Sequence, residues 1–199
     1  MKIAHTLYSQ IISLDHHFQA REEFKVGKRK KKDVQAFERI LEDNLFRLHE
    51  ELRTKTYRQA SYTAFNIYDP KFRHIHKATV ADRIVHHAIV SVIEPLFDKT
   101  FIYDSYSCRV GRGTHKAVKR LFHFIRRVSK NYQGNCFALK LDIKKFFESV
   151  DHTILLDLMQ KRTNDSDLLW LLEHILKSFS LKKGMPIGNL TSQLFANVY

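Results

Sequence analysis

The sequence lacks the cysteine and histidine patterns that mark disulfide-rich folds and structural metal sites. Its 199 residues include two cysteines, Cys108 and Cys136, which are too far apart to form a Cys-x-x-Cys pair. This usage fits a reducing compartment. Twelve histidines are present, but no His-Glu-x-x-His or Cys-x-x-Cys…His pattern occurs. We therefore expect the histidines at 16–17, 74–76 and 86–87 to be surface residues or polar residues with satisfied hydrogen bonds.

Long apolar runs, a signal peptide, internal repeats and low-complexity linkers are also lacking. These absences predict a soluble, cytoplasmic protein with no membrane partner. Hydrophobic residues make up 44% of the chain and aromatic residues 12%, which is enough to bury the core of one domain or of two small lobes.

Acidic residues are few relative to basic ones. The chain has 34 Lys plus Arg against 21 Asp plus Glu, which gives a formal net charge of +13 at pH 7. Such an excess favours nucleic acid as a partner, because each neutralised phosphate releases a counterion. A ribosomal or merely basic protein would have the same composition.

The spacing of apolar residues in the N-terminal half predicts helices before and after a short hairpin. Apolar residues repeat at steps of three and four from 34 to 52, which predicts an amphipathic helix with Asp33 as its N-cap. The basic run at 25–32 before it is either a solvated loop or a contact for nucleic-acid phosphates. Another apolar stripe predicts a helix over 82–97, with Pro95 perturbing its last turn.

Two β-like runs, 62–68 and 71–77, are joined around Asp69-Pro70 and predict a hairpin. Period-two geometry places Lys71 and Arg73 on one face of the second strand. Two cations near a hairpin tip can hold a triphosphate, or they can be ordinary exposed residues.

The second half alternates helices with one predicted strand. A glycine-punctuated loop at 106–114 leads into a helix for which Thr114 is the predicted N-cap, with a buried stripe at 117, 118, 121, 122, 125 and 128. Residues 137–143 predict a strand, and 154–161 and 168–179 predict helices.

Asp142 lies near the end of the predicted strand, on the face opposite Leu141 and Ile143. A carboxylate in this position is a candidate ligand for Mg²⁺, which takes one or two carboxylates together with substrate phosphates. One aspartate cannot hold two ions, so further carboxylates are required. Spacing alone favours the interpretation of Asp142 as a solvent-exposed strand-end residue.

Four sequence blocks in order resemble the motifs of reverse transcriptases. The fingers motif corresponds to 69–73 and 82–88, the next block to 105–117, motif A to 142–152 and motif B to 184–193. The resemblance extends from about residue 37 to residue 199. Any one block is weak support, but their order makes the resemblance specific.

The resemblance implies an α+β fold of the right-hand polymerase type, with fingers, part of a palm and no thumb. Its segments would be N-terminal helices and fingers at about 1–98, palm with motif A at 99–151, a helical segment at 152–183 and palm motif B at 184–199. Because residue 199 precedes the family's Tyr-x-Asp-Asp motif, we expect this chain to be an inactive fragment.

The implied reaction is addition of dNTPs to a primer 3′-hydroxyl on an RNA template, with two Mg²⁺ ions. Asp142 would bind both ions, and the backbone carbonyl of Ile143 would be a further ligand. Lys71 and Arg73 match the residues that bind the incoming triphosphate, and Phe147 matches a steric gate that selects deoxynucleotides. Without the resemblance, a phenylalanine such as Phe147 is more often a core residue than a gate.

Four further positions match residues that support template and primer. They are Arg109, Gly111, Gly188 and Gln193. Motif B reads Ile187-Gly188…Ser192-Gln193 and is similar to reverse transcriptases of diversity-generating retroelements. Those enzymes copy RNA with errors at adenines, assisted by a small basic accessory variability protein, and Ile187 would reduce fidelity by removing hydrogen bonds near the nascent pair.

Other functions are compatible with the same residues. The chain could be a reverse transcriptase of the group II intron or retron type, or a non-catalytic RNA-binding module on the same scaffold. An RNA-templated RNA polymerase is disfavoured by Phe147.

Overall fold

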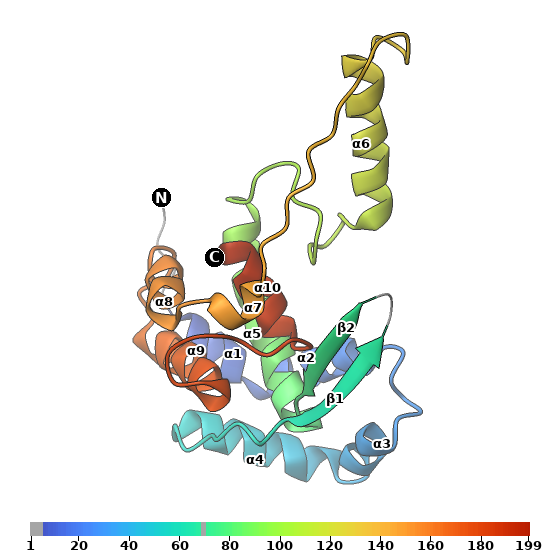
Figure 1. Ribbon diagram of the computed structural model, residues 1–199. Coiled ribbons are helices and arrows are strands. Elements are labelled where there is room, and N and C mark those ends of the chain that lie inside the picture. Colours follow the sequence, from blue (N-terminus) through green and yellow to red (C-terminus); the bar gives the residue numbers. More distant parts are fainter. Residues whose placement is uncertain (1–5, 69–70) are drawn as a thin grey trace.

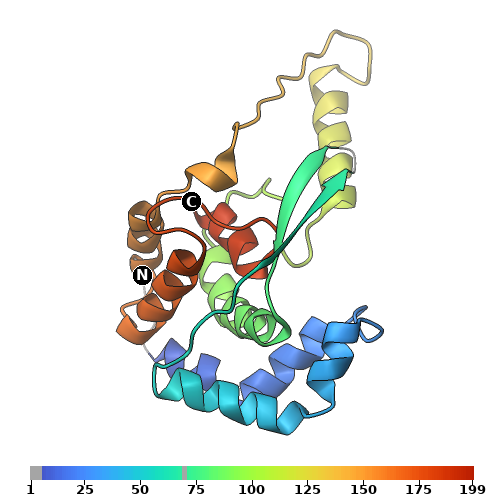
Figure 2. The same cartoon turned by 60° about the horizontal axis from the view of Figure 1, so that its bottom comes forward.

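The computed structural model describes residues 6–68 and 71–199. It has the mixed α+β architecture that the sequence predicts, with a helical body and a small antiparallel hairpin that projects from its side (Figures 1 and 2). The elements of the described residues are α1 (Leu7–Ile12), α2 (Leu14–Lys25), α3 (Lys32–Glu38), α4 (Leu41–Arg53), β1 (Thr63–Tyr68), β2 (Phe72–Lys77), α5 (Val80–Asp98), α6 (Thr114–Val128), α7 (Phe146–Ser149), α8 (His152–Gln160), α9 (Ser166–Phe179) and α10 (Leu190–Val198).

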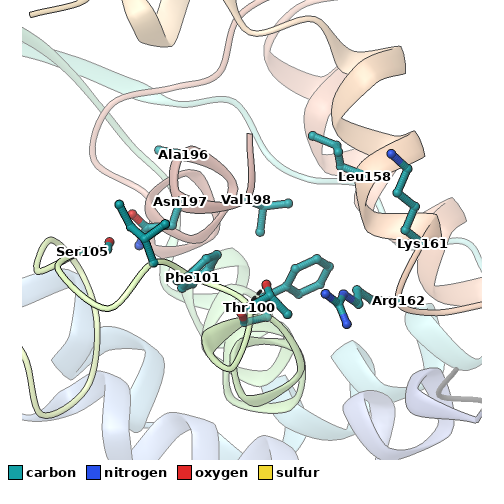
Figure 3. Close-up of a pocket in the computed structure, with 11 residues that line it drawn as sticks. Thr100, Phe101, Ser105, Leu158, Lys161, Arg162, Ala196, Asn197 and Val198 are labelled. Atoms are coloured by element: carbon teal, nitrogen blue, oxygen red, sulfur yellow. Dashed lines mark hydrogen bonds between the residues drawn. The ribbon is translucent and has the colours of Figure 1, made fainter. Parts of the chain in front are cut away.

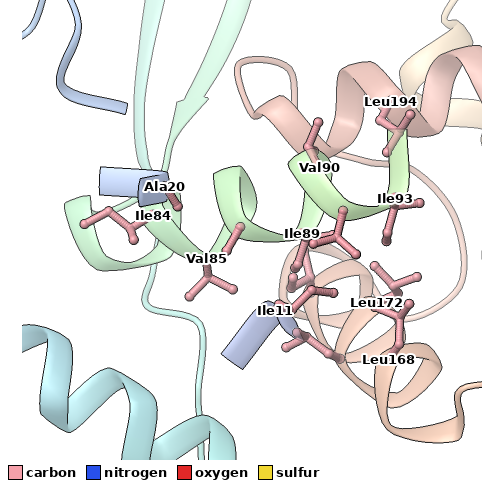
Figure 4. Close-up of a cluster of buried hydrophobic side chains, with 14 of the residues drawn as sticks. Ile11, Ala20, Ile84, Val85, Ile89, Val90, Ile93, Leu168, Leu172 and Leu194 are labelled. Carbon is pink, nitrogen blue, oxygen red and sulfur yellow. The ribbon is translucent and has the colours of Figure 1, made fainter. Parts of the chain in front are cut away.

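Helix α5 is the centre of the core and confirms the helix predicted at 82–97. It is apolar on most sides, and it packs against α1, α2, α3, α4 and α10. Figure 4 shows Ile84, Val85 and Ile89 of α5 among buried side chains from the surrounding helices. A helix with apolar residues all round is stable only when neighbours cover it, which explains its central position.

The stripe predicted from 34 to 52 is present but belongs to two helices, α3 and α4, rather than one. Asp33 is not an N-cap, because it lies inside the first turn of α3. Its carboxylate instead forms ion pairs with Arg83 at 2.6 Å and Lys77 at 2.7 Å. Sequence spacing could not reveal these partners, which lie more than forty residues further along the chain.

The predicted hairpin is confirmed. Strands β1 and β2 pair antiparallel, with Thr63 opposite Lys77 and Tyr68 opposite Phe72. The expected turn at Asp69-Pro70 lies outside the described residues. Helices α8 and α9 confirm the two predicted C-terminal helices, and each begins with an aspartate that accepts backbone hydrogen bonds: Asp151 for α8 and Asp165 for α9.

The predictions for 114–143 are partly wrong. Helix α6 exists, but its N-cap is Gly113 rather than Thr114, and none of its residues is buried. Residues 137–143 do not form a strand within the described part of the chain. The side chains of Phe137, Leu139 and Leu141 are 92%, 86% and 81% exposed.

The physical reason is that burial requires a partner. The alternation of apolar and polar residues at 137–143 suits a strand, and α6 has a strongly apolar face, but no described element packs against either. Figure 1 shows α6 standing apart from the helical body, with the extended segment running back from its far end to α7.

Among the helices of the described chain, none is long and apolar enough to cross a membrane.

Candidate active site

The segments on either side of α8 and α9 come together through backbone hydrogen bonds. Gly184 N–H donates to the Val150 carbonyl and Met185 N–H to the Phe147 carbonyl, both at 2.8 Å. The ring of buried His152 reaches the Gly184 carbonyl at 2.7 Å. The segment after Asp142 and the glycine turn near 184 therefore form one unit, although more than thirty residues separate them.

This pairing and the role of His152 did not emerge from the sequence. The available sequence feature was that His152 directly follows the N-cap Asp151. Local spacing does not identify its hydrogen-bond partner, Gly184, which lies 32 residues away. Gly184 has φ of +89°, a conformation that glycine adopts without strain. A Cβ there would lie 3.3 Å from the Glu148 carbonyl oxygen, so the close pairing of the two segments also requires a small residue.

The turn before α10 contacts the hairpin. The His76 N–H of β2 donates to the Ile187 carbonyl at 2.9 Å. Gly188 has φ of +118°, and a Cβ on it would lie 2.8 Å from Ile75 Cγ2. Ile187 is half-buried, whereas Gly188 and Gln193 are exposed. Ile187 and Gly188 of the predicted motif B therefore lie against β2 of the hairpin.

Phe146 and Phe147 both pack against the edge of the hydrophobic core and remain partly exposed. Their ring centroids are 5.7 Å apart at right angles, and the Phe146 ring also lies 6.1 Å from that of Tyr199. The partial exposure of Phe147 is compatible both with a core role and with contact to a bound molecule.

Asp142 and Ile143 lie in the exposed segment that precedes α7. Among residues 6–68 and 71–199, no group of three or more His, Cys, Asp or Glu side chains is placed to hold a metal ion. A two-ion Mg²⁺ site needs more carboxylates than Asp142 alone supplies. The described residues therefore do not by themselves fit such a site.

Lys71 and Arg73 are exposed beside the outer end of the hairpin. Tyr68 and Phe72 pair across the same end of the hairpin, are largely exposed, and have ring centroids 5.0 Å apart. Because neighbouring strand residues point to opposite faces, these rings lie on the face opposite Arg73. Binding of a triphosphate by Lys71 and Arg73 stays a prediction.

Arg109 organises the loop before α6. It is 9% exposed, and its guanidinium donates to the Asp98 carboxylate at 2.7 Å and to the carbonyls of Asp98, Ile102 and Ser105. Gly111 has φ of +71° in the same loop. Support of template or primer by these two residues stays a prediction, while their local role is to hold the loop in its conformation.

A cavity of about 570 Å³ lies between the end of α5, α8 and α10 (Figure 3). Phe101, Lys161, Arg162 and Asn197 are among its lining residues, and Asn197 donates to the Ser107 carbonyl at 3.0 Å. None of the site residues predicted from the sequence lines this cavity. Its position gives no support to a role in the chemistry expected of Asp142.

Of the six histidines at 16–17, 74–76 and 86–87, His17 and His86 are buried and have ring nitrogens without a hydrogen-bond partner within the described residues, contrary to the expectation of surface residues or polar residues with satisfied hydrogen bonds. His17 is fully buried, and burial, with a smaller effect of nearby His49, lowers its pKa to about 4. Burial also lowers the pKa of His86 to about 3, and its Nδ1 has no hydrogen-bond partner within the described residues. The available sequence feature for predicting this burial was that each histidine belongs to an adjacent pair in a helix. The two members of such a pair point about 100° apart, so one of them can face the core.

The turn before α10 thus contacts the hairpin, and the glycine turn near 184 contacts the segment at 147–150; the order of the sequence blocks alone did not predict these contacts. A sequence profile of the family described as "Reverse transcriptase (RNA-dependent DNA polymerase)" matches residues 66–199. The match covers more than half of the chain, and the chain belongs to the reverse transcriptase family.

Its relatives include intron-encoded proteins. The chain is 31% identical over 102 residues to nuclear intron maturase 1 of Arabidopsis thaliana, covering 51% of this chain and 13% of that protein. It is 26% identical over 137 residues to the group II intron-encoded protein LtrA of Lactococcus lactis, covering 65% and 22%. The chain thus spans less than a quarter of the length of these two relatives.

The fold also resembles solved structures. A chain of a partial Cas6-RT-Cas1–Cas2 complex superposes with a TM-score of 0.62 at 21% identity, covering 97% of this chain and 33% of that chain. At this identity the likeness supports the fold alone. It extends the agreement to the N-terminal helices, which the family profile does not cover.

Proposed function

We propose that this chain is the fingers and part of the palm of an RNA-directed DNA polymerase. The observation that carries the proposal is the contact of three segments. Motif B bonds to the motif A segment through Gly184 and Met185, and to the fingers hairpin through Ile187. A polymerase needs these parts together because nucleotide, primer and template must be positioned at one place.

In this proposal, different residues of the chain position the incoming dNTP and the template. Lys71 and Arg73 bind the phosphates of the incoming dNTP, where the Arg guanidinium can contact two oxygens. Gly188 and Gln193 support the template, and Phe147 excludes the ribose 2′-hydroxyl. In the complete enzyme, Asp142 would be one ligand of two Mg²⁺ ions, with further carboxylates required, and the ions would supply charge stabilisation and activation of the attacking hydroxyl.

The direct test is primer extension by the protein translated from the entire reading frame that contains this chain. We expect dNTP incorporation on an RNA template with a DNA primer, and much weaker incorporation of NTPs. Salt-sensitive RNA binding without any incorporation would instead support the non-catalytic RNA-binding alternative.

For the subtype, we propose a reverse transcriptase of a diversity-generating retroelement, which copies adenines with errors and works with a small basic accessory protein. The support is the Ile187-Gly188…Ser192-Gln193 form of motif B. The group II intron type is the second candidate, because the two relatives described above are named as an intron maturase and an intron-encoded protein.

Fidelity separates these candidates. Ile187→Gln is expected to reduce misincorporation opposite template adenines, because a polar side chain restores hydrogen bonding near the nascent pair. Accurate copying of adenine by the unmodified enzyme would contradict the diversity-generating assignment and favour the intron type.

A further inference from the structure

A cavity of about 180 Å³ lies where the basic run after α2 folds against the start of α5 and the motif B turn. It is lined on one side by Lys28, on the α5 side by Arg83, His86 and His87, and on the motif B side by Gly188 and Gln193. None of the described lining residues is acidic. Lys28 lies outside the segment that matches the family profile.

The two cations of this cavity share one aromatic ring. Lys28 Nζ lies 5.1 Å from the centroid of the buried Phe24 ring, and Arg83 Cζ lies 4.8 Å from it. Lys28 also donates to the Phe24 carbonyl at 2.7 Å, which fixes its position. Burial and the charge of Arg83 lower the pKa of Lys28, so the protein holds two like charges close together at an energetic cost.

The histidines of the cavity experience the same positive field. His87 packs edge-on against Phe24, with ring centroids 5.8 Å apart. Burial first, and then the charges of Lys28 and Arg83, lower its pKa to about 4. His86 contacts Gln59 through Nε2 at 3.2 Å, but its buried Nδ1 has no partner in the described residues.

The nearby carboxylates do not balance the cations. Asp33 accepts from both Arg83 and Lys77; burial acts to raise its pKa, but these two bonds outweigh burial and lower the pKa to about 2. Glu23 lies 3.8 Å from His87 Nδ1, with its side chain 59% exposed. The three cations Lys28, Lys77 and Arg83 therefore have two nearby carboxylates. These are Asp33 and Glu23, and the Glu23 side chain is largely exposed to solvent.

We propose that this cavity binds one phosphodiester group of a single-stranded template, held by the Lys28 ammonium and the Arg83 guanidinium beside the motif B turn. An anion there would offset the excess positive charge and accept hydrogen bonds from both cations. Because Gly188 is fixed against β2, the phosphate would hold the strand next to the turn that is proposed to support the nascent base pair. The identity of the strand as template rests on the proposed function.

Binding of a short single-stranded RNA to the 199-residue chain, measured by fluorescence anisotropy at several salt concentrations, tests the site. Lys28→Gln is expected to weaken binding by about fivefold or more and to reduce the salt slope by about 1. Lys30→Gln is the matched control, because it removes the same charge from an exposed residue of the same run. Equal effects of the two variants would overturn the proposal.

A second readout uses His87, whose surroundings are Glu23 and the Phe24 ring of α2, Lys28, and Arg83 and His86 of α5. Replacing chloride with inorganic phosphate at constant ionic strength should raise the pKa of His87 measured by NMR, because a bound anion offsets the neighbouring cations. The rise should shrink in Lys28→Gln. An unchanged pKa in phosphate would refute the site.

These outcomes are separate from polymerase activity. A chain that shows both effects but whose complete protein extends no primer would refute the proposed function and retain the phosphate site. A dNTP that displaces the RNA in wild type but not in Lys28→Gln would assign the site to a triphosphate and overturn the template assignment.

Discussion

Gly188→Ala tests whether the motif B turn must lie against the fingers hairpin. Gly188 has φ of +118°, where an alanine costs roughly 1–3 kcal/mol of backbone strain. Its Cβ would also lie 2.8 Å from Ile75 Cγ2. That methyl belongs to a β-branched side chain with little rotamer freedom, so overpacking adds about 1–3 kcal/mol. The expected loss in free energy of unfolding is therefore roughly 2–6 kcal/mol.

Gly27→Ala is the matched control. Gly27 also has positive φ, +70°, but no atom lies within 4 Å of the position that a Cβ would take there. The substitution should cost about 1–2 kcal/mol, the strain of a left-handed residue alone. Urea unfolding followed by circular dichroism measures both values. Equal losses for Gly188→Ala and Gly27→Ala would refute the close contact between the turn and β2.

Three further predictions concern buried polar groups and the proposed gate. Asp82→Ala should lower the free energy of unfolding by roughly 2–4 kcal/mol. The reason is that buried Asp82 accepts a hydrogen bond from the Tyr57 hydroxyl at 2.7 Å, and the substitution would leave that hydroxyl without its partner. A loss below about 1 kcal/mol in urea unfolding would contradict this prediction. His17 has a pKa of about 4 in the folded state and 6.5 in the unfolded state. Between these pH values the unfolded state binds more protons than the folded state. The free energy of unfolding should therefore fall by about 3 kcal/mol as the pH drops from 6.5 to 4. His17→Leu should remove that part of the pH dependence, and identical pH–stability curves for the two proteins would show that His17 does not titrate in this way. In the complete enzyme, Phe147→Ala should admit ribonucleotides, measured as the ratio of kcat/KM for NTP to that for dNTP, whereas unchanged sugar discrimination would limit Phe147 to a core role.

Sequence periodicity predicted the elements whose partners are in the described chain. Helices α5, α8 and α9 follow their apolar patterns because neighbouring elements cover their apolar faces, whereas the largely exposed β1–β2 hairpin is held by pairing between its own strands. The same reasoning was wrong for the burial of α6 and for the strand at 137–143. An apolar face shows which side of a segment can be buried, and only a packed neighbour decides whether it is.

Long-range polar contacts were the other part that the sequence could not supply. Asp33 reads as an N-cap from its position but pairs with Arg83 and Lys77. His152 and Gly184 are ordinary residues in sequence and come into contact only after α8 and α9 fold back. The motif residues were predicted from the order of the sequence blocks, whereas their contacts depended on the tertiary fold.

The most direct test of the central claim compares two carboxylate variants in the protein from the entire reading frame, Asp142→Ala and Glu148→Ala. Primer extension on an RNA template is measured for both, with RNA affinity measured in parallel. We predict that Asp142→Ala abolishes extension and leaves RNA binding largely intact, while Glu148→Ala retains extension. Substantial extension by Asp142→Ala would contradict the assignment of Asp142 as the metal-binding carboxylate of a polymerase.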